Sequence, residues 1–307
     1  MNDTSPLKGL PLVLGGNVFG WTASGDDGFA VLDAYYEAGG RTIDTADSYS
    51  IFVPGHVGGE SESYIGNWLS SRGIRPHMKI HTKVGNLPEH NRYDLRTVTK
   101  AIDRSLDRLQ TDYVDLYYLH SDNQDISMEQ IVESMDSTVK ANKARALAAS
   151  NIKMSRLSES IEIAKATKSS QFIALQNQYN LLERSDFDKN YQTFCLDNKI
   201  CMFPFFGLAS GYLTGKYRNP EDFNKWPRGM RTRSYEENGP ALLAVMDQIS
   251  LETGASLAEI ALSWLLRQPG ITAPIASART VDQVNQIVAS TSLDLNQDQL
   301  DRLTNHD

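Results

Sequence analysis

The stretch MKIHTKVGNLPEHNRYDLRTVTKAIDRSLDRLQTDYVDLYYLH, residues 78–120, carries the pattern that decides the fold. Its two ends, 78–84 and 113–120, are short apolar runs typical of buried strands. Between them, residues 95–110 space their apolar side chains at helical intervals, which predicts an amphipathic helix. A strand, a helical crossover and a second strand predict two parallel neighbours in one sheet.

The same alternation continues in both directions along the chain. Further strands are expected at 10–16, 41–46, 144–150, 172–180, 200–206 and 271–277. A doubly wound open sheet and a closed barrel both fit such a pattern. The first would show GxGxxG after its first strand, and GGNVFG (15–20) does not match it. Eight units without an obvious edge favour an α/β fold with a single (β/α)8 TIM barrel, as one domain over residues 1–307.

The composition narrows the class of protein. The 307 residues are 40% hydrophobic and 22% charged, with a net charge of −8, so nucleic acid and anionic membranes are not expected as partners. The N-terminal residues lack a signal-peptide pattern. Two cysteines, Cys195 and Cys201, predict buried thiols in a reducing cytoplasm. The histidines are scattered without ligand spacing, so no metal is expected.

The connection between the seventh and eighth expected strands is unusually long, roughly 65 residues or about twice an ordinary unit. Its second half contains two expected helices, 241–254 and 257–268. Its first half, 216–239, is polar and rich in Lys, Arg, Pro and Gly. This segment is either a solvated loop or a lid that closes over a phosphate-bearing cofactor. A Walker A loop is excluded, because Ser210 stands where GLASGYLTGKY (207–217) would need its first glycine.

Polar residues recur where the expected strands end, and that end of a barrel carries the active site. Asp44 ends the second strand with Tyr49 just beyond it, Lys83 ends the third, and His120 ends the fourth. Asp44, Lys83 and His120 are each roughly 40 residues apart, about one strand–helix unit, so they should face one mouth. Any one of them alone would be an ordinary satisfied polar residue.

These four groups together suit proton transfer to a carbonyl oxygen. A tyrosine hydroxyl has a pKa of ~10, and a neighbouring ammonium group lowers it. The aspartate keeps a buried lysine charged, and a neutral histidine can orient the carbonyl. None of these side chains delivers a hydride, so a redox cofactor is required. A lysine in a barrel could instead form a Schiff base in an isomerase or lyase, and that hypothesis stays open.

Seven motifs in this order and spacing resemble the aldo-keto reductases, NADP(H)-dependent barrel enzymes, over nearly the whole chain. They are DTADSYS (44–50) with GGESE, HTKVG, DLYYLHSD, ASN (149–151), LQNQYNLLER, GLASGYLTGKY and SARTVDQV. The form of the tyrosine loop is similar to the bacterial branch nearer the potassium-channel β-subunit type. The resemblance implies Asp44, Tyr49, Lys83 and His120 as the catalytic tetrad, with Tyr49 as general acid.

The resemblance also implies a cofactor site for NADP(H). Ser150, Asn151 and Gln176 would hold the nicotinamide carboxamide, and Phe205 would stack on its ring. Asp44 is also an implied cofactor-site residue. The others are Gly16 and Asn17 near the nicotinamide ribose, Gly207, Leu208, Ser210, Gly211 and Lys216 at the pyrophosphate, and Ser277, Arg279, Gln283 and Gln286 at the adenosine phosphate and adenine. Departures from the family pattern are Ala149, Gly207, Ile287 and a missing lysine at the 2′-phosphate, which leaves Arg279 as the main charge there.

Two functions remain from different classes. The first is an NADPH-dependent oxidoreductase that reduces aldehydes or ketones. The alternative is an NADPH-binding regulatory or redox-sensing subunit with little turnover. Five aromatic residues are candidate walls of an apolar substrate pocket, and each could equally be ordinary packing: Phe19, Trp21, Phe52, Tyr118 and Trp226.

Overall fold

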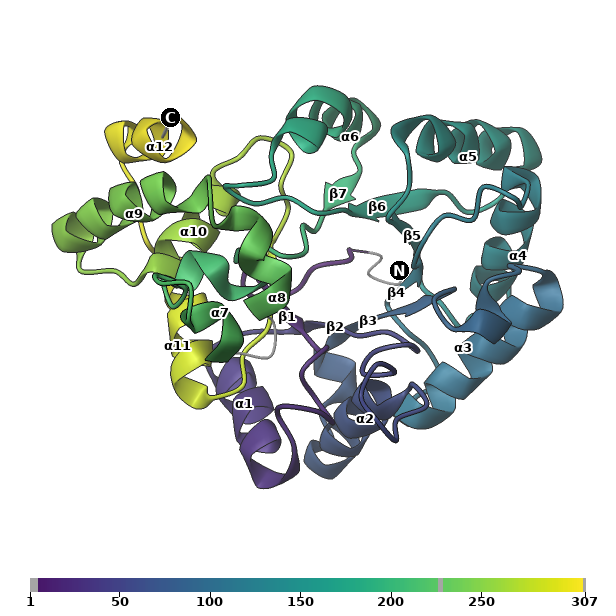
Figure 1. The fold of residues 1–307 in the computed structure, drawn as a ribbon. Coiled ribbons are helices and arrows are strands. Elements are labelled where there is room, and N and C mark those ends of the chain that lie inside the picture. The colour runs from purple at the N-terminus through teal and green to yellow at the C-terminus, as the bar shows by residue number, and fades with distance from the viewer. Residues whose placement is uncertain (1–4, 226–228, 306–307) are drawn as a thin grey trace.

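The computed structural model describes residues 5–225 and 229–305, so Trp226 and Arg228 lie outside the described residues. Eight parallel strands form one curled sheet with helices around its outside (Figure 1). The strands are β1 Val13–Gly15, β2 Thr42–Asp44, β3 Lys79–Val84, β4 Leu116–Leu119, β5 Leu147–Ser150, β6 Phe172–Gln176, β7 Cys201–Met202 and β8 Ile275–Ala276. Each lies inside a range that the sequence predicts, which confirms the α/β class with eight parallel strands.

The strand order is β7-β6-β5-β4-β3-β2-β1-β8, so each strand pairs with its neighbour in sequence and β1 also pairs with β8. The two edges of this order also approach each other. Met202 in β7 bridges to Ile271, and the Ile275 amide in β8 donates to the Pro204 carbonyl over 2.9 Å. Parallel pairing brings the carboxyl ends of all eight strands to one end of the sheet.

The longer helices follow the strands in alternation, as the sequence predicts. They are α1 Gly25–Glu37, α2 Glu60–Arg72, α3 Leu95–Leu109, α4 Met128–Lys140, α5 Met154–Thr167, α6 Gln192–Asn198, α9 Gly239–Thr253, α10 Leu257–Leu266, α11 Val281–Ala289 and α12 Gln297–Thr304. In α3, the Asp94 carboxylate caps the start by accepting from the Thr97 amide over 2.9 Å. Its buried residues, including Val98, Ile102 and Leu109, recur at helical spacing and face the sheet.

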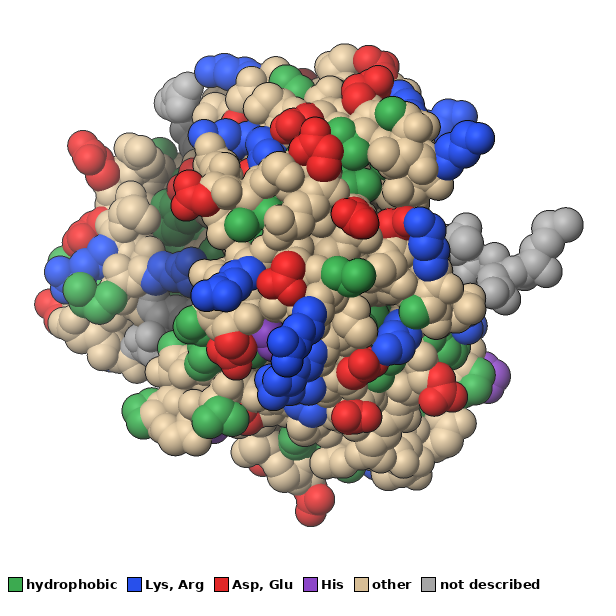
Figure 2. Space-filling model, turned by 90° about the vertical axis from the view of Figure 1, so that its right-hand side faces the viewer, with side chains coloured by type: hydrophobic (Ala, Val, Ile, Leu, Met, Phe, Trp, Pro, Cys, Tyr) green, Lys and Arg blue, Asp and Glu red, His purple; other side chains and the backbone are tan. Residues whose placement is uncertain are grey.

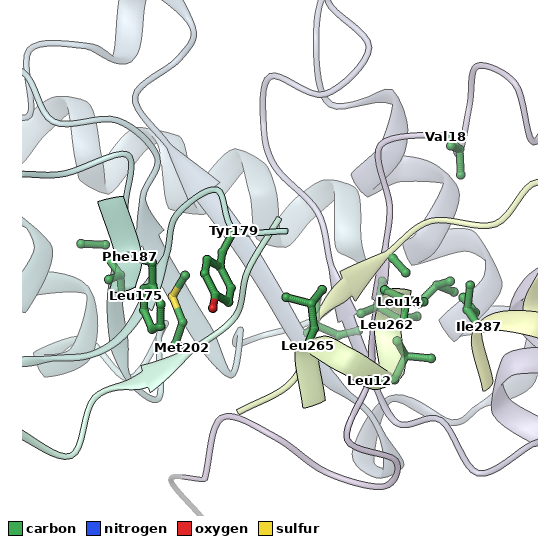
Figure 3. Close-up of a cluster of buried hydrophobic side chains, with 14 of the residues drawn as sticks. Leu12, Leu14, Val18, Leu175, Tyr179, Phe187, Met202, Leu262, Leu265 and Ile287 are labelled. Carbon is green, nitrogen blue, oxygen red and sulfur yellow. The ribbon is translucent and has the colours of Figure 1, made fainter. Parts of the chain in front are cut away.

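Successive residues of the strands contribute to two separate cores. Val13, Leu116 and Tyr118 belong to a small cluster inside the curled sheet, together with Phe203 and Ile275. Their alternating neighbours, such as Leu12, Leu14, Tyr117 and Leu119, belong to the larger cluster between sheet and helices (part of it in Figure 3). Because side chains alternate across a strand and both faces are covered, almost every strand residue is buried.

The chain between β7 and β8 contains six helical segments among its described residues. They are η4 Ala209–Thr214, α7 Asp222–Lys225, α8 Gly229–Thr232, η5 Arg233–Tyr235, α9 and α10. The polar first half of this connection is anchored by aromatic rings rather than fully solvated. Tyr217 stacks between Tyr212 and Phe223 at 6.2 and 5.3 Å, and Tyr235 packs on Tyr212 at 5.6 Å. The sequence pattern of this segment does not predict such anchoring.

The outer surface carries charges of both signs. Figure 2 shows Lys and Arg side chains interspersed with Asp and Glu over one face. In the part of the chain that the structure covers, no one helix has the length and apolar character to cross a membrane. The pair α9 and α10 meets the criteria of length and composition only when taken together, with a bend of 96° between them.

Candidate active site

The four candidate catalytic side chains come from three neighbouring strands and one turn. Asp44 is the last residue of β2, Lys83 the fifth of the six in β3, and His120 follows β4 directly. The register pairs Asp44 with His81 and Lys83 with Tyr118. Tyr49 lies in the turn after β2, which brings it back over the strand ends. The structure thus brings together the residues that the sequence groups at the strand ends.

Lys83 is the centre of this group. Its Nζ donates to Asp44 Oδ2 at 2.5 Å, to the Thr45 carbonyl at 2.7 Å and to Tyr49 Oη at 2.8 Å. The Tyr49 hydroxyl donates in turn to Asp44 Oδ2 at 3.1 Å. Because Lys83 is 0% exposed, these contacts operate with little solvent screening. The arrangement therefore ties one buried carboxylate and one ammonium group directly to the tyrosine oxygen.

Burial governs the protonation of both basic groups. It lowers the pKa of Lys83, and the nearby Asp44 carboxylate is the main opposing influence. Burial also lowers the pKa of His120 well below its usual value, and the positive charge of Lys83 adds to that effect. His120 is therefore a neutral imidazole at neutral pH. A neutral imidazole can donate one hydrogen bond and accept another.

The His120 ring is held between the tyrosine and a serine. Its plane lies edge-on to the Tyr49 ring, with centroids 5.9 Å apart. The Ser48 hydroxyl lies 3.4 Å from Nδ1 of His120. Sequence reasoning missed Ser48, and its only signal was its position next to Tyr49. The contact adds to the packing against Tyr49 in orienting the His120 ring.

Amide and hydroxyl side chains border the group on the β5–β6 side. The Gln176 amide donates to Asp44 Oδ1 at 3.0 Å, and the Ser150 hydroxyl donates to the Gln176 carbonyl at 2.7 Å. Asn151 donates to the His120 carbonyl at 2.9 Å and holds a left-handed φ of 48°. A non-glycine residue in that conformation is strained, and such residues cluster at functional sites. These three residues therefore share one hydrogen-bonded frame with the tetrad.

A cavity of about 860 Å³ opens over these groups. Almost all candidate cofactor-site residues line it: Asn17, Asp44, Ser150, Asn151, Gln176, Phe205, Gly207, Leu208, Ser210, Gly211, Lys216, Ser277, Arg279, Gln283 and Gln286. Tyr49 and His120 line it as well, whereas Lys83 lies behind Tyr49 and does not. Gly16 also does not line it, although its neighbours Gly15 and Asn17 do. A Cβ on Gly15 would approach the Ser277 hydroxyl to 2.5 Å, so the walls are close there.

The cavity wall includes basic side chains and a backbone segment of unusual conformation. Lys216, Arg279 and Arg231 contribute their positive charges to its wall. Ser210 and Gly211 both have left-handed φ values, 57° and 97°. The Gly211 amide donates to the Leu208 carbonyl at 2.8 Å, so a backbone hydrogen bond closes this bend. Gln283 accepts from the Arg279 amide at 2.8 Å, so its side-chain oxygen is already engaged.

The four candidate pocket walls among the described residues fall into two pairs. Trp21 and Phe52 line the cavity, and their rings lie edge-on with centroids 5.0 Å apart. Phe19 and Tyr118 are fully buried and do not line it, so for these two the alternative of ordinary packing holds. Phe19 stacks on Tyr64, and Tyr118 points into the barrel core beside His81. The periodicity of the sequence did not distinguish an inward-facing aromatic residue from one that faces the cavity.

Comparison with known proteins matches nearly the entire chain to one protein family. The model of the aldo/keto reductase family matches residues 11–307. Norsolorinic acid reductase stcV of Emericella nidulans is 29% identical, over 96% of this chain and 78% of the relative. Protein tas of Escherichia coli is 28% identical, over 96% of this chain and 93% of the relative. Versiconal hemiacetal acetate reductase of Aspergillus parasiticus is 27% identical, over 92% and 88% respectively.

Proposed function

Because the chain belongs to the aldo/keto reductase family, we propose that it is an NADPH-dependent oxidoreductase that reduces aldehydes or ketones to alcohols. The relatives named as reductases support an oxidoreductase. The observation that carries the proposal is the position of Lys83 Nζ, 2.5 Å from Asp44 and 2.8 Å from the Tyr49 hydroxyl. The proposal includes a single domain, residues 1–307, closed into a (β/α)8 barrel. Its cytoplasmic location stays a prediction.

The residues around the cavity fit a nicotinamide dinucleotide phosphate. Amide and hydroxyl groups of Ser150, Asn151 and Gln176 suit a carboxamide beside the reacting groups. Lys216 and Arg279 in the cavity wall suit phosphates. The cavity volume is within the ~300–1,000 Å³ range of cofactor and ligand sites. When bound, this cofactor supplies the hydride that no side chain of the chain can deliver.

The residues of the chain then carry the proton and the positioning. Tyr49 donates its hydroxyl proton to the carbonyl oxygen, and Lys83 stabilises the phenolate that remains. Asp44 holds Lys83 charged against the cost of burial. Neutral His120 orients the carbonyl oxygen beside Tyr49. Trp21 and Phe52 in the cavity wall support an apolar or aromatic substrate.

A Schiff base on Lys83 has less support. The amine is fully buried, donates three hydrogen bonds and does not line the cavity. A substrate carbonyl in the cavity would meet Tyr49 and His120 instead. Acid catalysis by Tyr49 therefore explains the geometry, whereas nucleophilic attack by Lys83 does not.

The test is an NADPH-oxidation screen over short aldehydes, aromatic aldehydes, ketones, sugars and pyridoxal, with NADH in parallel. We expect turnover with at least one aromatic carbonyl and a preference for NADPH. Tight NADPH binding without oxidation by any compound would overturn the reductase proposal and favour a regulatory subunit. Faster turnover with NADH would overturn the cofactor preference alone.

A further inference from the structure

A second buried ionisable pair lies behind the tetrad, and the proposed reaction does not use it. His90 Nδ1 and Asp47 Oδ2 are 2.7 Å apart. The Asp47 side chain is 0% exposed and the His90 side chain 4%. Asp47 lies two residues before Tyr49, and His90 closes η2 (Pro88–His90), the short turn after β3. The pair therefore joins the turn that carries Tyr49 to the loop that follows Lys83.

Backbone contacts place this pair next to Lys83. The Asp47 amide donates to the carbonyl of Lys83 at 3.3 Å. The Lys83 ammonium group in turn donates to the carbonyl of Thr45, in the same turn. Ser48, the residue between Asp47 and Tyr49, contacts His120. A shift of Asp47 would therefore move the turn that contacts Lys83 and His120 and carries Tyr49.

Stability alone does not account for the pair. Asp47 Oδ1 and His90 Nε2 are both buried and have no hydrogen-bond partner among the described residues. A buried polar atom without a partner is unfavourable, and a buried carboxylate more so. Apolar side chains of similar size would avoid this cost. The pair is explained instead by what its charge and position do for its neighbours.

The charge of Asp47 acts on Lys83. The anionic groups that support a protonated Lys83 are Asp44 from β2, Asp47 from the turn and Glu62 from α2. Tyr49 hydrogen-bonds to the ammonium group, the Tyr118 ring from β4 lies 5.6 Å from it, and its charge acts on His120. Burial raises the pKa of Asp47, and the hydrogen bond from His90 is the largest opposing influence. The charge of Arg108 and the Ser48 hydroxyl also support the carboxylate, so loss of His90 would remove the largest of several influences that keep Asp47 charged beside Lys83.

We propose that Asp47 and His90 are positioning residues for the Tyr49–Lys83 pair. His90 helps to keep Asp47 as a carboxylate, and Asp47 fixes the Tyr49 turn against β3 and supports the charge on Lys83. The role in turnover rests on the proposed reductase function, whereas the effect on Lys83 does not.

The experiment compares His90→Leu, which removes the donor, with His90→Asn, whose amide can replace Nδ1. His77→Leu is the matched control, because His77 ends the corresponding Pro-containing turn before β3, η1 (Arg75–His77), and is exposed. We expect His90→Leu to lower kcat roughly ten- to a hundredfold, the range for lost supporting partners at functional sites. KM and the NADPH dissociation constant should stay within about twofold of their wild-type values, because the lost interaction acts in the transition state and not on binding. His90→Asn should recover most of kcat.

A second measurement does not depend on turnover. The ε-carbon signals of 13C-labelled lysines are titrated by NMR, and Lys83→Met identifies the signal of Lys83. The titration midpoint of Lys83 should fall in His90→Leu and in the nearly isosteric Asp47→Asn, and stay unchanged in His77→Leu. If His90→Leu does not fold, the titration midpoint of Lys83 and kcat are compared in Asp47→Asn and His90→Asn instead. The proposal would be overturned if the titration midpoint of Lys83 did not change in His90→Leu and Asp47→Asn. Equal losses of kcat in His90→Leu and His77→Leu would overturn it as well. A wild type without turnover would overturn the reductase function, and the titration would still decide this inference.

Discussion

Tyr49 is held by two partners at once, because its hydroxyl accepts from Lys83 and donates to Asp44. We expect Tyr49→Phe to lower kcat by ~10²–10⁴-fold, the usual effect of a lost general acid. NADPH binding should stay nearly intact, since the phenyl ring still fills the same space. Stopped-flow turnover and cofactor titration measure the two effects separately. Retention of more than about a third of wild-type kcat would move the proton donor to another group, with His120 the first candidate.

We propose Arg279 as the residue whose charge would distinguish NADPH from NADH. It lines the cavity, and no carboxylate within residues 5–225 and 229–305 pairs with it. A charge-assisted hydrogen bond contributes ~1.5–3 kcal/mol, and ~1.4 kcal/mol is tenfold in affinity. Arg279→Ala should therefore weaken NADPH roughly ten- to a hundredfold and NADH by no more than a few-fold. Dissociation constants for both cofactors test this, and an unchanged NADPH/NADH ratio would exclude Arg279 as the 2′-phosphate ligand.

The segment 217–239 is the element that we propose as a lid over the cofactor. Tyr217 stacks on Tyr212 of η4 and on Phe223, whereas Arg218, Arg231 and Arg233 are exposed. Arg231 reaches the cavity wall and lies 4.3 Å from the Phe206 ring centroid. We expect trypsin to cleave this segment readily in the apo protein and more slowly with NADP⁺, because a bound phosphate would hold the basic residues in place. Equal cleavage rates with and without the cofactor would show that the segment is an ordinary surface loop and not a lid.

The stability of the whole molecule should depend on its buried histidines. Burial lowers the pKa of both His81 and His120. Below about pH 6.5, the unfolded chain therefore binds protons that the folded chain does not, and unfolding becomes more favourable. Each histidine contributes a slope of up to about 1.4 kcal/mol per pH unit. The stability that the neutral histidines contribute is thus present above that pH and is lost as the pH falls.

Urea unfolding of the apo protein between pH 5 and 8 measures this slope. His81→Gln is the comparison, because glutamine can still donate toward the Pro6 carbonyl that His81 Nε2 contacts at 2.7 Å. We expect a smaller loss of stability at low pH in the variant. Burial raises the pKa of Asp47 and Glu62, which acts in the opposite direction and is common to both proteins. Parallel pH profiles for wild type and variant would show that His81 does not contribute.

Periodicity was sufficient to predict the alternating elements. All eight strands lie within expected ranges, and α3, α9 and α10 start or end within two residues of their predicted limits. These elements are local, since each needs only an apolar run or a helical spacing to form. The clustering of Asp44, Lys83 and His120 was also predictable, because they occupy equivalent points in successive units and parallel pairing brings such points together.

The amino-acid sequence by itself determined the strands, the crossovers and the side chains at the strand ends, because those follow from short-range patterns. Only the tertiary structure decided which aromatic residues face the cavity, as Trp21 and Phe52 do and Phe19 and Tyr118 do not. It alone also paired Asp47 with His90 and Ser48 with His120, residues 43 and 72 positions apart. Such contacts depend on how separate loops meet over the strand ends. Burial, which sets the pKa of Lys83 and His120, likewise exists only after the whole sheet has curled around them.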